Sequence, residues 1–304
     1  MLVFELVASD GLPLDQHIAF INHIANAARR EYDSFFGAYG MRVYYTRKEY
    51  ERVTWNLFGT LPYRELSTVS LPNDLGTKIM ADVMKFNGDS HVYKRIGRPY
   101  KRVYCLHGPP GTGKTSLVMA IASELRRPLA IFNVDSLRDD TFIELISSRP
   151  NDAVLMFEDV DVLFKESKKD SGGMTLSTLL NSLDGVLHPS GALVFLTTNH
   201  IDRLDSALTR PGRLDYVVEI GYSTPEQRVA LWQAIFPTTP APAVLARKDL
   251  MNITPAWLSA NLLEMRDAGP EEAARALMML LLKVEAPDAV PEKKKKKKKV
   301  PARS

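Results

Sequence analysis

The stretch Gly108-Pro-Pro-Gly-Thr-Gly-Lys114-Thr115 lies between an apolar run at residues 103–106 and a segment in which apolar residues follow helical spacing. A glycine-rich loop between a strand and a helix is the context in which a phosphate-binding loop works. Its glycines let backbone N–H groups turn toward phosphate oxygens, and the N-terminus of the helix adds positive potential. A plain Gly/Pro turn is the alternative, but the complete motif in this position favours the phosphate loop. We therefore expect Lys114 to contact the β- and γ-phosphates of a nucleotide and Thr115 to offer a hydroxyl to Mg²⁺.

Short apolar runs alternate with helical patterns from about residue 103 to residue 220. This alternation is typical of the α/β class, in which helices cover both faces of a parallel sheet. The 3.6-residue spacing predicts crossover helices around residues 117–125 and 142–146. The simplest count is five buried parallel strands, at residues 103–106, 129–132, 153–157, 192–196 and 216–220.

The chain before the sheet has a different composition. Nine aromatic residues lie between Tyr32 and Phe58, and alternation over residues 52–58 suggests strands. We interpret residues 1–60 as a separate aromatic-rich module and residues 61–222 as the large α/β subdomain.

The chain after the sheet also changes character. Pro225, Pro255 and Pro270 each stand where a helix is expected to start, so residues 223–285 are predicted to form a small helical subdomain. Seven consecutive lysines at 293–299 cannot bury apolar surface and repel one another. Residues 286–304 are therefore expected to be a disordered tail.

Composition limits the class of protein. Of the 304 residues, 45% are hydrophobic and 25% are charged, as in an ordinary globular protein. No apolar stretch approaches the ~20 residues that span a bilayer, and the first residues lack the features of a secretory signal. The single cysteine, Cys105, cannot form an internal disulfide, and the six histidines show no zinc-ligand spacing. We expect an intracellular soluble protein, cytoplasmic or, if the lysine run is an import signal, nuclear.

The formal net charge of +3 arises from the tail. Residues 291–304 carry eight basic residues and one acidic residue, so residues 1–290 have a formal net charge of −4. The globular part of the chain is therefore mildly acidic.

Polar residues follow two of the predicted strands. Glu158 and Asp159 come directly after residues 153–157, 44 residues beyond Lys114, and Asn199 follows residues 192–196. An acidic pair after a strand is usually a helix cap or a solvated turn, but its spacing to a complete phosphate loop favours a catalytic role. One carboxylate can belong to the Mg²⁺ shell and the other can orient a water. The amide of Asn199 can hydrogen-bond the γ-phosphate or that water.

Arg210 and Arg213 flank a Pro-Gly pair. A turn with surface arginines is the simpler interpretation. However, negative charge that develops on the γ-phosphoryl group in the transition state needs a well-placed cation, and a guanidinium donated by a neighbouring subunit would serve. The arginines therefore favour a ring of identical subunits.

Taken together, these motifs resemble the AAA family of ATPases. The resemblance is carried by GPPGTGKTS at 108–116, by the Glu158-Asp159 pair, by TTN at 197–199 and by LDSALTRPGRLD at 204–215. Within the family, the chain is similar to the BCS-type members, on the basis of residues 93–102, the order Glu158-Asp-Val-Asp161 and residues 175–185. The similarity covers about residues 60–285.

The resemblance implies a P-loop AAA fold with a five-stranded parallel sheet, a small C-terminal helical lid, and ATP and Mg²⁺ as cofactors. BCS-type members are mitochondrial chaperones that move the folded Rieske iron–sulfur subunit across a membrane. Glu158 takes the Mg²⁺-associated position with Thr115, Asp159 polarises the attacking water, and Asn199, Arg210 and Arg213 complete the catalytic set. The phosphate-binding residues are Gly108, Pro109, Pro110, Gly111, Thr112, Gly113, Lys114, Thr115 and Ser116.

We expect a mechanochemical ATPase that forms a homo-oligomeric ring and remodels or translocates a protein partner. The rival hypothesis is a nucleic-acid-associated ATPase whose lysine run neutralises phosphates. We rank it lower because no basic stripe with interleaved aromatic residues accompanies that run. A third hypothesis, a nucleotide switch without hydrolysis, would need an incomplete catalytic set, whereas the motifs above supply every member.

Overall fold

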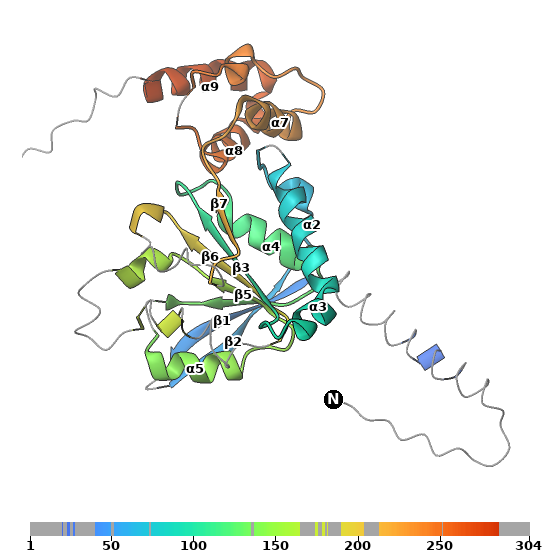
Figure 1. Ribbon diagram of the computed structural model, residues 1–304. Coiled ribbons are helices and arrows are strands. Elements are labelled where there is room, and N and C mark those ends of the chain that lie inside the picture. The colour runs from blue at the N-terminus through green and yellow to red at the C-terminus, as the bar shows by residue number, and fades with distance from the viewer. Residues whose placement is uncertain are drawn as a thin grey trace, which may run out of the picture. The chain divides into compact units, whose positions relative to one another are not determined.

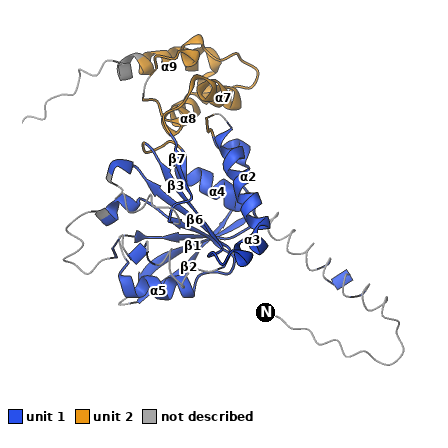
Figure 2. Ribbon diagram, in the orientation of Figure 1, with its two compact units in different colours: residues 1–69, 73–108, 113–220 blue, residues 70–72, 109–112, 221–304 orange. Residues whose placement is uncertain are grey.

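The computed structural model describes residues 40–285 except 50–51, 73, 135–136, 165–173, 176–177, 180, 182–189, 204–212 and 251, and it describes residues 20, 23, 24 and 27 before them (Figure 1). The chain divides into two compact units (Figure 2). The first comprises residues 1–69, 73–108 and 113–220, and the second comprises residues 70–72, 109–112 and 221–304. The predicted tail and most of residues 1–39 lie outside the described residues.

The first unit is built on a seven-stranded sheet with the order β2-β1-β4-β5-β6-β3-β7. Each neighbouring pair is parallel except β1 and β2. The α/β class is therefore confirmed, and each predicted strand is present. These strands are β3 (Lys101–His107), β4 (Leu129–Phe132), β5 (Val154–Phe157), β6 (Ala192–Thr198) and β7 (Tyr216–Glu219).

The count of five strands is wrong because an N-terminal hairpin extends the sheet. Strands β1 (Met41–Glu49) and β2 (Arg52–Leu61) pair with each other, and β1 pairs in parallel with β4 through Tyr44 and Ala130. Trp55 on β2 donates from Nε1 to the carbonyl of Leu145 at 2.9 Å and packs edge-on against Phe132. Residues 41–61 thus belong to the sheet rather than to a module of their own. Alternation in the sequence indicates which side chains share a face, but not which strand lies alongside.

Helices cover both faces of this sheet (Figure 1). The connection from β3 through α4 (Lys114–Glu124) leads to β4, and the connection from β4 through α5 (Asp139–Ser147) leads back toward β5. Crossover connections between parallel strands are right-handed, and these two connections move across the sheet in opposite directions. The helices α4 and α5 therefore lie on opposite faces of the sheet. Both helices confirm the predicted crossovers. Among the elements whose bounds the structure describes, this unit also contains α2 (Leu75–Gly88) and α3 (Ser90–Arg95), with 3₁₀ turns at Leu66–Thr68, Val160–Phe164 and Ile201–Arg203.

An aromatic cluster fixes α5 against the central strands. Phe132 of β4 and Phe157 of β5 stack with ring centroids 4.3 Å apart, and Phe142 of α5 packs edge-on against both. All three side chains are fully buried. Burying a side chain of this size contributes about 1.5–3 kcal/mol, so the cluster firmly aligns β4 with β5 and brings their carboxyl ends to one edge.

The second unit is helical, with α7 (Pro225–Ile235), α8 (Pro255–Glu264), α9 (Pro270–Glu285) and 3₁₀ turns at Ala243–Ala246 and Arg266–Ala268. Each predicted start at a proline is present. Thr224 and Thr254 cap the first two helices by accepting hydrogen bonds from the backbone three residues on. Trp232 and Leu258 lie at the centre of the core of this unit. In the described part of the chain, no helix combines the length and apolar character that crossing a bilayer requires.

Candidate active site

The predicted phosphate loop joins β3, which ends at His107, to α4, which begins at Lys114. Gly108 and Gly113 have φ angles of 140° and 103°, which favour glycine. A Cβ atom at Gly108 would also lie 2.1 Å from the carbonyl oxygen of Ile220, so a side chain cannot be accommodated there. The tip of the loop, Pro109–Thr112, belongs to the second unit, and within it the Thr112 hydroxyl donates to the carbonyl of Pro109 at 2.9 Å.

Lys114 is the first residue of α4 and is buried, with 8% of its surface exposed. Its ammonium group donates to the carbonyl of Gly108 and to Oδ1 of Asn199, each at 2.7 Å. Burial lowers the pKa of Lys114, while the nearby carboxylates of Asp159 and Asp161 oppose that shift. The cation is therefore held at the start of the phosphate loop by acceptors that a phosphate group can replace.

The next residue, Thr115, contacts the acidic end of β5. Its hydroxyl donates to Oε1 of Glu158 at 2.9 Å, so the two predicted Mg²⁺-associated groups lie together. Mg²⁺ prefers oxygen ligands and is usually bound by one or two protein groups together with substrate phosphates and water. A hydroxyl and a carboxylate beside a phosphate loop fit this chemistry. No group of three or more His, Cys, Asp or Glu side chains that could hold a metal ion occurs among the residues described.

The ends of β5 and β6 are joined side by side through polar side chains. The N–H of Asp159 donates to the Thr197 hydroxyl at 3.1 Å, and the Thr198 hydroxyl donates to Asp161 at 3.1 Å. Asn199 donates from Nδ2 to Oδ1 of Asp159 at 3.3 Å. Both threonines are buried, so these bonds satisfy polar groups that would otherwise lack partners. Three consecutive residues at the carboxyl end of β6, residues 197–199, thus hold the acidic segment that follows β5, residues 158–161, in place.

Asp159 itself is exposed and has a left-handed backbone conformation, with φ 48°. Asp and Asn are among the non-glycine residues that adopt this conformation most readily, and such backbone conformations are concentrated at functional sites. Glu158, in contrast, is half-buried and faces Thr115. The two neighbouring carboxylates therefore contact different partners.

The arginines are placed less completely. Arg210 lies outside the described residues. Arg213 is described and half-buried, two residues before Asp215, whose backbone N–H donates to the carbonyl of Val103 on β3 at 2.9 Å. Ser116, the last residue of the quoted loop motif, is half-buried on α4.

Sequence reasoning missed two contributions to this region. Thr197 and Thr198 bond to Asp159 and Asp161, a role that the sequence analysis did not assign, although both threonines belong to the TTN motif at 197–199. The hairpin contributes Tyr45 and Phe58 to a cavity of about 620 Å³ that also borders Glu158 and Asp159. No signal in the sequence placed the hairpin there.

Comparison with known proteins agrees with this geometry. Residues 104–222 match the ATPase family associated with various cellular activities (AAA). The chain is 38% identical over 195 residues to the mitochondrial chaperone BCS1 of Homo sapiens, covering 60% of this chain and 46% of that protein. It is 41% identical over 181 residues to a probable mitochondrial chaperone bcs1 of Schizosaccharomyces pombe, covering 57% and 40%. An AAA-ATPase of Arabidopsis thaliana is 38% identical over 168 residues, covering 51% and 36%. The chain thus spans half or less of the length of each of these relatives.

Replacing Lys114 tests the phosphate-loop assignment. Lys114→Ala removes the buried cation, and hydrogen bonds to charged groups are worth about 1.5–3 kcal/mol each. Loss of two such bonds should weaken ATP binding at least about 100-fold, measured by titration calorimetry with a non-hydrolysable ATP analogue and Mg²⁺. Lys78→Ala, which removes an exposed lysine of α2, is the matched control and should bind normally. Unchanged affinity in the Lys114 variant would contradict the assignment.

Proposed function

The chain carries an AAA ATPase domain of the BCS1 type, and we propose that it hydrolyses ATP with Mg²⁺ and uses this reaction to remodel a protein partner. The observation that best supports this proposal is the double contact of Asn199. Its Oδ1 accepts from Lys114 and its Nδ2 donates to Asp159, so one amide joins the phosphate-binding cation to the exposed carboxylate. An exposed carboxylate held next to that cation can orient a water against a bound phosphate, which is the step that hydrolysis adds to nucleotide binding.

Binding of the nucleotide is assigned to the phosphate loop and Lys114. The ammonium group would exchange its bonds to Gly108 and Asn199 for bonds to phosphate oxygens. Thr115 and Glu158 would hold Mg²⁺, which neutralises charge on the β- and γ-phosphates. The bond between the Thr115 hydroxyl and Glu158 supports this pairing because it already brings the two oxygen groups together.

Hydrolysis is assigned to Asp159 as the group that polarises the attacking water. Its carboxylate is exposed, and it accepts a bond from Asn199 rather than from the phosphate-loop helix. Release of Asn199 by Lys114 would leave the amide oxygen available to accept a hydrogen bond from the attacking water. The different partners of Glu158 and Asp159 support the proposed division of roles between them.

Stabilisation of the negative charge that develops on the γ-phosphoryl group in the transition state is assigned to Arg210 and Arg213 of a neighbouring subunit. A homo-oligomeric ring is therefore part of the proposal. The family of the domain supports this, since a guanidinium supplied in trans serves the same purpose in related phosphoryl transfer. A ring also explains how hydrolysis at one site can move a neighbouring subunit.

The partner is proposed to be a protein. Two of the relatives are named as mitochondrial chaperones, or probable ones, and this supports chaperone-like remodelling in this chain. Those names offer no support for the cytoplasmic or nuclear location expected from composition. We accordingly propose a mitochondrial location for this chain.

Replacing each residue of the acidic pair by its amide, in separate variants, distinguishes the two proposed roles. Asp159→Asn keeps the left-handed backbone accessible but removes the carboxylate, so ATP should bind normally while turnover falls about 10²–10⁴-fold, the usual contribution of a general base. Glu158→Gln is the matched variant and should instead raise the Mg²⁺ concentration for half-maximal activity about tenfold or more. Phosphate release measured across a Mg²⁺ series distinguishes the two. Near-normal turnover in Asp159→Asn would mean that the roles are assigned wrongly.

Mixing variants tests the ring. Arg213→Ala and Lys114→Ala proteins should each hydrolyse ATP poorly, the arginine variant by ~10³–10⁵-fold if its guanidinium acts in trans. In a mixed assembly, some interfaces combine an intact phosphate loop with an intact arginine, so steady-state ATPase activity should partly return. Absence of recovery in assemblies shown to be mixed by light scattering and subunit exchange would rule out a shared site.

A further inference from the structure

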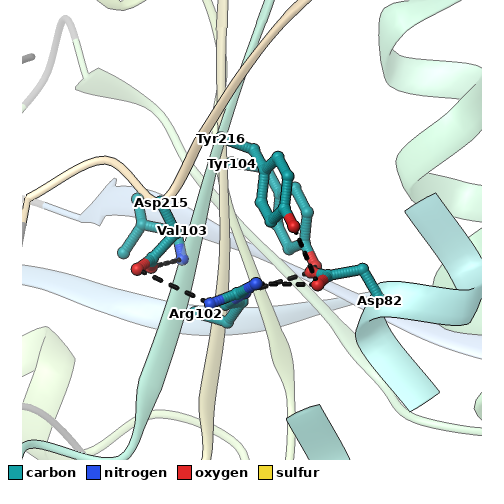
Figure 3. A network of polar contacts seen from close by, with 6 residues as sticks. All are labelled: Asp82, Arg102, Val103, Tyr104, Asp215 and Tyr216. Atoms are coloured by element: carbon teal, nitrogen blue, oxygen red, sulfur yellow. Dashed lines mark hydrogen bonds and ion pairs between the residues drawn. The ribbon is translucent and has the colours of Figure 1, made fainter. Parts of the chain in front are cut away.

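A second polar cluster lies away from the phosphate loop and is centred on Asp82 of α2 (Figure 3). Arg102 of β3 donates to this carboxylate from Nε at 3.0 Å and from Nη2 at 2.7 Å. The hydroxyl groups of Tyr104 and Tyr216 donate to the same carboxylate, the latter at 3.1 Å. Four donor groups from two neighbouring strands therefore converge on one side chain of α2.

This cluster is supported by packing as well as by charge. Tyr104 and Tyr216 are register partners on β3 and β7, and their rings stack with centroids 5.5 Å apart. The Arg102 guanidinium lies over the Tyr216 ring, 4.8 Å from its centroid. Burial by itself would raise the pKa of Asp82, but the bonds from Arg102 and the two tyrosines outweigh it and lower that pKa. The carboxylate is therefore held in its charged form.

Arg102 also faces a second carboxylate, that of Asp215 (Figure 3). Its Nη1 lies 3.8 Å from Oδ1 of Asp215, and the side chains of Arg102 and Asp215 are only 21% and 25% exposed. The other oxygen of Asp215 accepts from the N–H of Val103 at 2.8 Å, and the Asp215 N–H donates to the Val103 carbonyl at 2.9 Å. Asp215 thus binds both backbone groups of one β3 residue, immediately before β7 begins.

Asp215 follows Arg213 with only Leu214 between them, and Leu214 is buried in the core of the sheet. Arg213 is therefore followed directly by two residues that the sheet holds in place, the first by burial and the second by hydrogen bonds. The second of these residues, Asp215, is bonded to β3, the strand that also leads into the predicted phosphate loop.

We propose that Asp215, held by Val103 and by the Asp82–Arg102 pair, is the positioning residue that fixes Arg213 for its action on the neighbouring subunit. This inference rests on the proposed function, because it requires Arg213 to act in trans. Asp215 touches neither nucleotide nor water in this assignment. Its loss should therefore leave the subunit's own site intact and impair the arginine that it presents.

The test is complementation of Asp215→Ala in full-length protein. The variant should bind ATP with normal affinity and KM but lose about 100-fold in kcat, the loss that a misplacement of about 1 Å can cause. Mixed with Lys114→Ala, whose arginines are intact, it should recover activity as the Arg213→Ala protein does. Mixed with Arg213→Ala, it should recover none, because neither subunit presents a placed arginine. Asp215→Asn, which keeps an acceptor for the Val103 N–H, should show a smaller loss.

Asp152→Asn is the matched control. Asp152 pairs with the buried Arg127 at 3.1 Å. It lies shortly before β5, far in the sequence from Arg210 and Arg213, and has no part in positioning them. It should stay active even if its melting temperature falls as much as that of Asp215→Ala. Equal loss of activity in this control would overturn the positioning role, because the loss would then follow from stability alone.

The outcomes separate the two proposals. If Asp215→Ala is fully active, or is rescued by neither partner while Arg213→Ala and Lys114→Ala rescue each other, the positioning role is wrong and the shared site stands. If Arg213→Ala and Lys114→Ala also fail to rescue each other, both proposals are overturned. Arg213 then does not act in a neighbouring subunit, and Asp215 has no such arginine to position.

Discussion

The contacts of the Asn199 side chain bring the proposed chemistry together. Its amide accepts from Lys114 and donates to Asp159, so groups from α4 and from the ends of β5 and β6 meet at one point. This is geometrically possible only because β5, β6 and β3 are adjacent and parallel, with their carboxyl ends at the same edge. The buried phenylalanine cluster on the α5 face aligns β5 with β4, the next strand of the same parallel set. The sheet therefore serves to place a cation, an amide and a carboxylate within hydrogen-bond distance.

Strand β3 connects this site with the cluster around Asp82. Its carboxyl end leads into the phosphate loop, while Arg102 and Val103 near its start bind Asp82 and Asp215. Both the proposed phosphate loop and Asp215, the residue that precedes β7, are thus connected directly to one buried strand, β3. A rigid strand that is shared in this way would keep the two functional segments of a subunit in fixed relation. The partly buried ion pairs are less screened by salt than surface pairs, which favours a geometric role for them.

Much of this arrangement was predictable from local sequence. The run at residues 192–196 predicts a buried strand because each of its residues is apolar, and the phosphate loop carries its own turn and helix signals. The position of the hairpin was not predictable, since β1 pairs with β4 across more than 80 residues of chain and alternation does not specify a partner. The same holds for Asp82, whose partners lie on strands that follow it. The role of Asn199 was expected, but its bond to Lys114 depends on how β3 and β6 align, which spacing alone does not give.

The most direct test of the central claim is a double-mutant cycle on single-turnover ATP hydrolysis with Asn199→Ala and Asp159→Asn. If Asn199 acts by joining Lys114 to Asp159, its replacement alone should slow hydrolysis about 10–100-fold, since a bond to a charged group is worth about 1.5–3 kcal/mol. In the Asp159→Asn background the same replacement should cost almost nothing, because the carboxylate that it serves is already gone. Losses that simply multiply in the double variant would show that the two side chains act independently, and would contradict the account.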